Sequence, residues 1–136
     1  MNIYEQLTRD EGFRQFPYED TVGKLTIGIG RNLDAKGVSE DEANYLLEND
    51  VKSVERGLES TLDWYASLDE ARRGVLTNMG FNMGVQGVLG FKNMLAYMQE
   101  GEWENAAGEM RNSKWYGQVG ARAERLAKQV ETGEWQ

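Results

Sequence analysis

One long amphipathic helix constrains the fold of this chain more than any other feature. A capping box opens it, because Ser39 and Glu42 stand at the spacing at which each side chain can accept from the other's backbone N–H. Apolar residues then recur with the helical period at Ala43, Leu47, Val51, Val54 and Leu58. The pattern predicts a helix over residues 39–59. In a chain of 136 residues, a helix this long is expected to connect two lobes.

A shorter helix is predicted at the start of the chain, over residues 3–11. Asn2 is a good N-cap, and Glu5 follows three residues later at the spacing of a second capping box. Gly12 is expected to end this helix as a left-handed C′ residue.

A β-hairpin is predicted between the two helices, with strands over Arg14–Glu19 and Lys24–Ile29 and a turn at 21–23. The evidence is a period of two along the second strand, which is typical of extended chain. Its aliphatic residues Leu25, Ile27 and Ile29 alternate with Thr26, Gly28 and Gly30. Residues 32–35 are expected to be irregular and polar.

Several short helices are predicted from about Leu68 onward, separated by glycines. The first apolar stripe comprises Leu68, Ala71, Val75, Met79 and Met83. A later stripe comprises Trp103, Ala106, Ala107 and Met110, and a last amphipathic helix covers 121–130.

The predicted fold class is therefore α+β and mostly helical, as a single two-lobed domain over 1–136. Residues 12–46 form the small lobe with its antiparallel hairpin, and residues 39–59 form the connecting helix. Residues 1–11 and 60–136 are assigned to the helical lobe.

Composition excludes several kinds of chemistry. The chain has no Cys and no His, so disulfides, thiol catalysis and Ser-His-Asp or Cys-His catalysis are ruled out. A metal site would have to consist of carboxylates, and no metal or other cofactor is expected. Acid–base catalysis must use Asp, Glu, Lys or Tyr. The net charge of −8 argues against nucleic acid or an anionic membrane as a partner.

No targeting or membrane segment is evident. The first residues lack the basic and apolar regions of a signal peptide, and no apolar run approaches the roughly 20 residues that span a bilayer. We therefore expect synthesis in the cytoplasm and no membrane insertion.

Glu11 is the first residue with unusual chemistry. Ile3, Leu7 and Glu11 fall at i, i+4 and i+8, so a carboxylate shares one helical face with two aliphatic side chains. Burial on that face and the nearby helix C-terminus would both disfavour the charged form, which favours a proton donor. The alternative is a glutamate that turns outward into solvent.

A second group of candidate residues lies in the predicted hairpin. Asp20 follows the first strand, and Thr26 lies on the same face of the second strand as Gly28 and Gly30. The two glycines leave bare backbone that a ligand can approach, which makes Gly30 a candidate substrate-binding residue. An acid, a second carboxylate and a hydroxyl that holds water suit glycoside hydrolysis. The alternative is that Asp20 and Thr26 are ordinary hairpin residues.

The order of these residues resembles a known catalytic motif. Glu11, then Asp20, then Thr26 within Leu-Thr-Ile-Gly-Ile-Gly is similar to the motif of the phage-type lysozymes, glycoside hydrolase family 24, and especially of its T-even phage enzymes. The likeness extends along nearly the whole chain. It includes Ser67–Asp69, Arg72, Arg73, Asn78, Met79, Phe81, Gly90, Phe91, Trp103, Trp115, Tyr116, Arg122, Thr132 and Gly133.

The resemblance implies a lysozyme-like fold and a hydrolytic mechanism. Glu11 would protonate the glycosidic oxygen, while Asp20 would stabilise positive charge on the sugar and hold the attacking water with Thr26. The bond implied is the β-1,4 linkage between N-acetylmuramic acid and N-acetylglucosamine in peptidoglycan. Arg122 matches an arginine that approaches the catalytic glutamate, and Phe81 matches an aromatic that lines the cleft, with core filling as its alternative.

Two departures from the family pattern bear on the site. Arg31 stands where the T-even enzymes have a histidine that pairs with the residue matching Asp69, so an Arg31–Asp69 ion pair is expected. A stretch of the hairpin lobe is also missing between Leu33 and Val38, which shortens one wall of the expected cleft.

Two other functions remain open. A lytic transglycosylase needs the acid but no carboxylate that directs water, and a wall-binding scaffold could keep the fold with little activity. The expected partners are peptidoglycan glycan strands, with the chain acting as a monomer. In a phage setting, release to the wall would require a separate holin-type pore.

Overall fold

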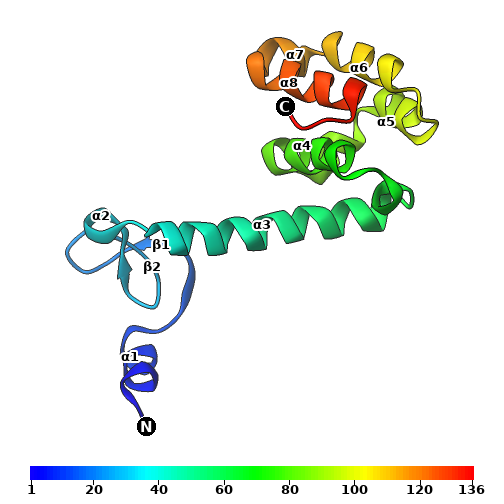
Figure 1. Cartoon of the computed structure of the whole chain (residues 1–136). Coiled ribbons are helices and arrows are strands. Elements are labelled where there is room, and N and C mark those ends of the chain that lie inside the picture. The colour runs from blue at the N-terminus through cyan, green and yellow to red at the C-terminus, as the bar shows by residue number, and fades with distance from the viewer. The chain divides into compact units, whose positions relative to one another are not determined.

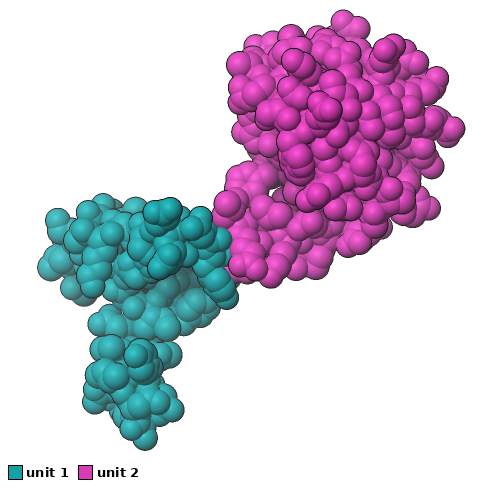
Figure 2. Space-filling view, viewed as in Figure 1, with its two compact units in different colours: residues 1–46 teal, residues 47–136 magenta.

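The computed structural model describes the whole chain, residues 1–136, as two compact units. Unit 1 comprises residues 1–46 and unit 2 comprises residues 47–136, coloured teal and magenta in Figure 2. The first helix is grouped with unit 1. The assignment of residues 1–11 to the helical lobe concerns the arrangement of the two units and stays a prediction.

Unit 1 contains a small antiparallel sheet between helices, which confirms the predicted hairpin. Its strands are ordered β1-β2-β3, and Thr26 on the central strand is paired with Tyr18 and Asn32 on either side. The elements are α1 (Ile3–Glu11), β1 (Arg14–Glu19), β2 (Leu25–Gly28), β3 (Arg31–Asn32) and α2 (Leu33–Lys36), labelled where visible in Figure 1.

The N-terminal cap of α1 is as predicted from the sequence, and its C-terminal cap is not. The predicted capping box is confirmed, since the Glu5 N–H donates to Asn2 Oδ1 at 2.9 Å and the Asn2 N–H donates to the Glu5 carboxylate at 3.3 Å. Gly12 has a positive φ of 72° but a ψ of 165°, so the expected left-handed helical conformation is wrong. The extended ψ directs the chain into β1, which begins two residues later.

The segment after β2 is more regular than predicted. Residues 32–35, expected to be irregular, belong to β3 and α2. Asn32 caps α2 by accepting from the Ala35 N–H at 3.0 Å, and Asp34 on that helix accepts from the Leu25 N–H of β2 at 2.8 Å. These two side-chain bonds order a segment that carries no hydrophobic periodicity.

Helix α3 (Glu40–Thr61) is the long helix predicted over 39–59, and it begins in unit 1 and ends in unit 2. Its capping box forms as expected: the Ser39 N–H donates to Glu42 Oε1 at 2.8 Å, and the Glu42 N–H donates to Ser39 Oγ at 3.2 Å. Only the second half of its apolar stripe is covered. Leu58 is fully buried, whereas Leu47 is half exposed.

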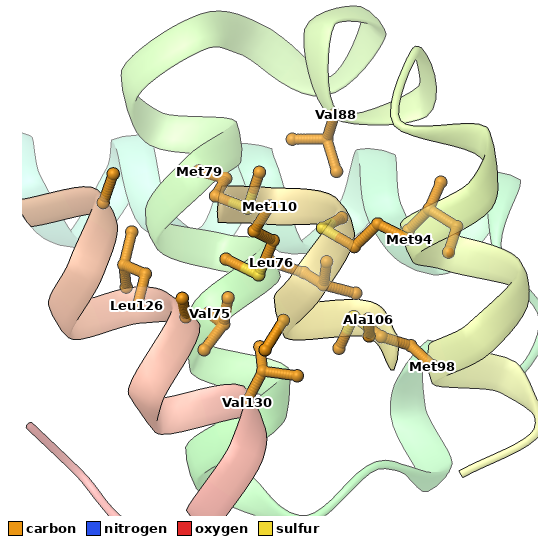
Figure 3. Packing of buried hydrophobic residues seen from close by; sticks show 14 of the residues in the cluster. Val75, Leu76, Met79, Val88, Met94, Met98, Ala106, Met110, Leu126 and Val130 are labelled. Carbon is orange, nitrogen blue, oxygen red and sulfur yellow. The ribbon is translucent and has the colours of Figure 1, made fainter. Parts of the chain in front are cut away.

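Unit 2 is entirely helical and holds the hydrophobic core. After the end of α3 it contains the short 3₁₀ helix η1 (Tyr65–Ser67), α4 (Glu70–Leu89), α5 (Lys92–Gln99), α6 (Trp103–Arg111), α7 (Lys114–Val119) and α8 (Ala121–Thr132). Side chains from α4, α5, α6 and α8 meet in one interior (Figure 3). The predicted stripes of α6 and α8 are buried there, so the α+β, mostly helical fold class is confirmed.

Glycines bring α3 and α4 into close contact. A Cβ atom at Gly57 would lie 2.8 Å from Val85 Cγ2, and one at Gly80 would lie 2.6 Å from Val54 Cγ1. Each glycine of the pair therefore receives a valine from the opposite helix. No helix of the chain combines the length and the apolar character required to cross a bilayer.

Candidate active site

Glu11 is the last residue of α1, and its carboxyl group lies against the backbone of Gly30. A Cβ atom at Gly30 would lie 2.8 Å from Glu11 Oε2 and 2.9 Å from Glu11 Cδ. Gly30 also has a φ of +68°, which L side chains rarely adopt. The residue therefore makes room for the carboxyl group of Glu11 between α1 and the sheet.

The residues of unit 1 do not bury Glu11, and its burial against unit 2 stays a prediction. Its side chain is exposed, and α1 contributes no buried residue at all. Ile3 and Leu7, the two aliphatic residues on the same face, are 56% and 45% exposed. The apolar pattern of α1 therefore does not enclose its carboxylate within unit 1.

Asp20 follows β1 and organises the tight turn that leads to β2. Its Oδ1 atom accepts from the N–H groups of Val22 and Lys24 at 2.9 and 2.8 Å. Its own N–H donates to the Lys24 carbonyl at 2.9 Å. Because both turn bonds use Oδ1, Oδ2 makes no hydrogen bond within the protein and can accept one from a water molecule.

Thr26 is the only residue of unit 1 that is classed as buried, at 4% exposure. Its hydroxyl donates to the Lys24 carbonyl at 2.9 Å, which leaves its lone pairs as acceptors. The backbone of Lys24 thus binds Asp20 through its N–H and Thr26 through its carbonyl. The structure brings these two predicted residues together through one shared neighbour.

The bare backbone expected beside Thr26 is present at Gly28. A Cβ atom built at Gly28 would have no neighbour within 4 Å, although its φ of +69° resembles that of Gly30. The two glycines therefore differ in surroundings: Gly28 faces open space, and Gly30 faces the carboxyl group of Glu11.

Arg31 has a partner that the sequence did not indicate. Its guanidinium forms a two-pronged ion pair with Glu42 on α3, including a 3.1 Å bond from Nη1 to Oε1, and it also donates to the Gly37 carbonyl at 3.2 Å. Hydrogen bonds from the Ser39 backbone and hydroxyl, and then Arg31, lower the pKa of Glu42. Glu42 thereby joins the cap of α3 to β3.

Asp69 lies in unit 2, where it caps α4. It accepts from the Arg72 N–H at 3.2 Å and pairs with Arg72 Nη1 at 3.4 Å. The side chains of Arg31 and Asp69 thus each engage a partner within their own unit, Glu42 and Arg72. The ion pair expected between Arg31 and Asp69 joins the two units and stays a prediction.

Phe81 and Arg122 line one groove of about 420 Å³ in unit 2, which we call the Phe81 groove. Phe81 is 47% exposed, so its alternative role as core filler is wrong. Arg122 donates to Asn78 Oδ1 through Nη2 at 2.7 Å and through Nε at 3.0 Å. The approach of Arg122 to Glu11 stays a prediction, because the two residues belong to different units.

Two members of the Phe81 groove were not singled out as site residues from the sequence. Asn78 holds the guanidinium of Arg122, and Trp135 contributes an exposed aromatic ring. The signal for Asn78 was its position three residues before Phe81, which places both on one face of α4. Trp135 follows the last helix and had no periodic pattern to mark it. No cluster of carboxylates in the chain is suited to hold a metal ion.

Comparison with known proteins gives the class of this one. Residues 8–131 match the family model described as phage lysozyme. A probable T4-type lysozyme 1 of Dictyostelium discoideum is 35% identical, with 97% of this chain and 95% of that protein aligned. The pre-baseplate central spike protein Gp5 of Enterobacteria phage T4 is 34% identical over 98% of this chain but only 28% of its own length. The peptidoglycan hydrolase gp36 of Pseudomonas phage phiKMV is 25% identical over 95% of this chain and 15% of its own length.

The fold and these matches define the class as lysozyme, a glycoside hydrolase. Within that class, the chain belongs to the phage lysozyme family, as its sequence motif predicted.

Proposed function

We propose that the chain hydrolyses the β-1,4 bond between N-acetylmuramic acid and N-acetylglucosamine in peptidoglycan. The observation that carries the proposal is the contact between the Glu11 carboxyl group and Gly30, in the same unit as the turn held by Asp20 and Thr26. Family membership and the peptidoglycan hydrolase among the relatives support the substrate class.

In this proposal Glu11 is the general acid. It donates a proton to the glycosidic oxygen as the bond to the leaving sugar breaks. Its exposure on unit 1 leaves the carboxyl group accessible to a glycan, and Gly30 offers backbone without a side chain on the adjoining surface. Gly30 therefore serves substrate binding by allowing sugar and acid to approach each other closely.

Asp20 and Thr26 are proposed to hold the attacking water. The unpaired Oδ2 of Asp20 and the lone pairs of the Thr26 hydroxyl are acceptors, and water has two donors to offer them. The negative charge of Asp20 also stabilises the positive charge that develops on the sugar in the transition state. Two backbone bonds to Asp20 fix the carboxylate, so little reorganisation accompanies the reaction.

Residues of unit 2 are proposed to bind the sugar and to place a positive charge near Glu11. Phe81 offers an exposed aromatic face for sugar binding, and Arg122, oriented by Asn78, offers a positive charge for the carboxylate of Glu11. Arg31 and Asp69 are proposed as supporting residues, through the ion pair predicted from the family pattern.

Clearance of a peptidoglycan suspension tests the proposal. The parent chain is expected to clear it, whereas Glu11→Gln and Asp20→Asn should slow clearance by at least about a hundredfold. The amide oxygen that Asp20→Asn introduces can still accept the two turn hydrogen bonds, so this variant isolates the charge. Glu19→Gln, which neutralises an exposed carboxylate at the end of β1, is the matched control and should clear at the parental rate.

Product analysis separates the alternatives. New reducing ends indicate hydrolysis, and anhydro sugars indicate a lytic transglycosylase. Binding without clearance would indicate a wall-binding scaffold, and equal clearance by parent and Glu11→Gln would remove Glu11 from the mechanism. A monomeric state, synthesis in the host cytoplasm and release through a separate pore stay predictions.

A further inference from the structure

Unit 2 contains a second groove that the proposed reaction does not use. It lies where the start of α4 and η1 meet the turn between α5 and α6, and it has a volume of about 340 Å³. We call it the tryptophan groove, since two indole rings line it together with polar side chains. The residues important here are Trp64, Asp69, Gln99, Glu100 and Trp103.

Contacts within the protein fix the backbone of Trp64 and the ring of Trp103. The Trp64 carbonyl accepts from the Ser67 N–H at 3.1 Å and from its hydroxyl at 2.7 Å, which fixes the backbone that carries the first ring. Arg72 lies over the ring of Trp103, 4.1 Å from its centroid. Arg72 is itself anchored by a 2.6 Å bond from Nε to the Val130 carbonyl. The ring of Trp103 and the backbone of Trp64 are therefore positioned before any ligand arrives.

Several polar groups of the groove have no partner within the protein. The indole N–H groups of Trp64 and Trp103 make no hydrogen bond there, and neither do the amide of Gln99 and the carboxylate of Glu100. Both indoles are half-buried against the core and line the groove, so it combines aromatic surface with polar groups that have no partner in the protein. A ligand that matches this lining has an apolar face and several hydrogen-bonding groups around its edge.

A pyranose sugar has this combination, because its ring C–H groups form an apolar face and its hydroxyls both donate and accept. An N-acetyl group adds a carbonyl that can accept from an indole N–H, and a methyl group that can pack on a ring. The charge of the groove selects among sugars. Glu100 is a carboxylate with no partner in the protein, so a ligand that carries its own carboxylate is disfavoured.

We propose that the tryptophan groove is a secondary glycan-binding site for a neutral N-acetylhexosamine, such as the N-acetylglucosamine units of peptidoglycan. Its volume suits one or two sugar residues, at the small end of ligand pockets. As a means of retaining the chain on its substrate, this site rests on the proposed function. Retention of this kind is valuable to a chain of net charge −8, which gains no electrostatic attraction to an anionic wall.

Indole N–H resonances provide a direct test, since the chain has four tryptophans and each gives one signal. N,N′-diacetylchitobiose is titrated into the full-length Glu11→Gln chain, and cellobiose, which lacks the N-acetyl groups, is the matched control ligand. We expect the signals of Trp64 and Trp103 to shift with diacetylchitobiose and to move at least about tenfold less with cellobiose at equal concentration. Unchanged Trp64 and Trp103 signals, or shifts confined to Trp115 and Trp135, would overturn the proposal.

Variants connect binding to action on the wall. Trp64→Ala should weaken binding of diacetylchitobiose about tenfold, whereas Tyr45→Ala, which removes an exposed aromatic ring outside both this groove and the Phe81 groove, should leave it unchanged. Gln99→Ala provides a second test that removes no ring from the edge of the core. If neither Trp64→Ala nor Gln99→Ala weakens binding, the proposal is wrong.

Activity distinguishes this proposal from the proposed function. Trp64→Ala should slow clearance of insoluble peptidoglycan several-fold and leave turnover of a dissolved oligosaccharide at the parental rate. A parent chain that hydrolyses neither substrate contradicts the proposed function, while the resonance shifts still decide on the groove. Normal hydrolysis without resonance shifts contradicts the groove alone.

Discussion

The two units differ in what they contain: unit 1 carries most of the proposed site residues, and unit 2 carries nearly all of the buried residues. Unit 1 carries Glu11, Asp20, Thr26 and Gly30, yet Thr26 is the only side chain that it buries. Unit 2 holds the other buried residues, most of them in one cluster built from α3, η1, α4, α5, α6, α7 and α8. A segment of 46 residues has too little volume to enclose a substantial core, so the proposed chemistry lies on the less stable part of the chain.

Unit 1 also leaves apolar surface open. A pocket of about 880 Å³ is lined by exposed apolar side chains, among them Phe13, Ile29 and Tyr45. Leu33 and Val38 line the same pocket. Unit 1 alone therefore does not cover this hydrophobic side, whereas unit 2 buries its apolar residues in one cluster.

The largest effect that this comparison predicts is on stability. Met110→Ala in unit 2 removes a fully buried side chain and should lower the free energy of unfolding by about 2–5 kcal/mol. Ile29→Ala in unit 1 removes a side chain that is 48% exposed and should cost less than about 1 kcal/mol. Urea unfolding of both variants measures the difference. An equal loss would show that Ile29 is covered in the folded chain and would break the comparison.

The second prediction concerns the two glycines of the sheet. Gly28→Ala and Gly30→Ala impose similar backbone strain, since their φ angles are +69° and +68°. Only the methyl group at position 30 would meet the carboxyl group of Glu11, at 2.8 Å. We expect Gly30→Ala to reduce clearance of peptidoglycan by up to about a hundredfold, because a displaced acid loses its alignment. Gly28→Ala should remain close to the parental rate. Equal losses in the two variants would show that the Glu11–Gly30 contact does not align the acid.

The fold was predictable from the sequence where a pattern depended on local chemistry. Both capping boxes, the hairpin and the buried stripes of α6 and α8 follow from spacing alone, and all are present. The prediction was wrong for residues 32–35, where two side-chain hydrogen bonds order a polar segment. It also did not pair Val54 with Gly80 or Val85 with Gly57, because a periodic stripe marks a buried face without identifying the residues that it meets on another helix.

The sequence predicted which residues belong to the candidate site better than it predicted their contacts and their burial. The sequence placed Asp20 and Thr26 on one hairpin, but only the structure gives the Lys24 backbone as their shared partner. The apolar pattern of α1 predicted a buried Glu11, but periodicity identifies a face without identifying what covers it, and unit 1 itself leaves this face exposed. The pairing of Arg31 with Glu42 was missed because the sequence assigned Glu42 to the cap of the long helix, and its carboxylate accepts from both Ser39 and Arg31.

The third prediction tests the assignment of residues 1–11 to the helical lobe. If that assignment holds, the apolar face of α1 is covered in the folded chain, and Leu7→Ser should lower the free energy of unfolding by about 1–2 kcal/mol. Arg9→Ser, at an exposed position on the opposite side of α1, should change it by less than about 0.5 kcal/mol. Urea unfolding again gives both values. Two equally small changes would leave α1 with unit 1 alone.

The smallest predicted effect concerns an ion-pair network that only unit 2 possesses. Arg111 on α6 pairs with two glutamates of α8, since its Nη2 atom lies 2.9 Å from Glu124 Oε1 and 2.7 Å from Glu131 Oε1. The Tyr116 hydroxyl also donates to Glu124 at 2.8 Å. Hydrogen bonds from Arg111 and then Tyr116 lower the pKa of Glu124 to about 2, and Arg111 lowers the pKa of Glu131 as well.

A pKa that is lower in the folded chain stabilises the folded state at neutral pH. For Glu124 this contribution is complete above its ordinary pKa of 4.5 and is lost as the pH falls towards about 2. Arg111→Met should raise the pKa of Glu124 part of the way to 4.5, with Tyr116 retaining the remainder, and should flatten the acid limb of the stability curve. Arg125→Met, which removes an exposed arginine from α8, is the matched control. Carboxyl resonances followed from about pH 6 to about pH 1.5 measure the pKa, and an unchanged Glu124 would show that solvent already screens the network.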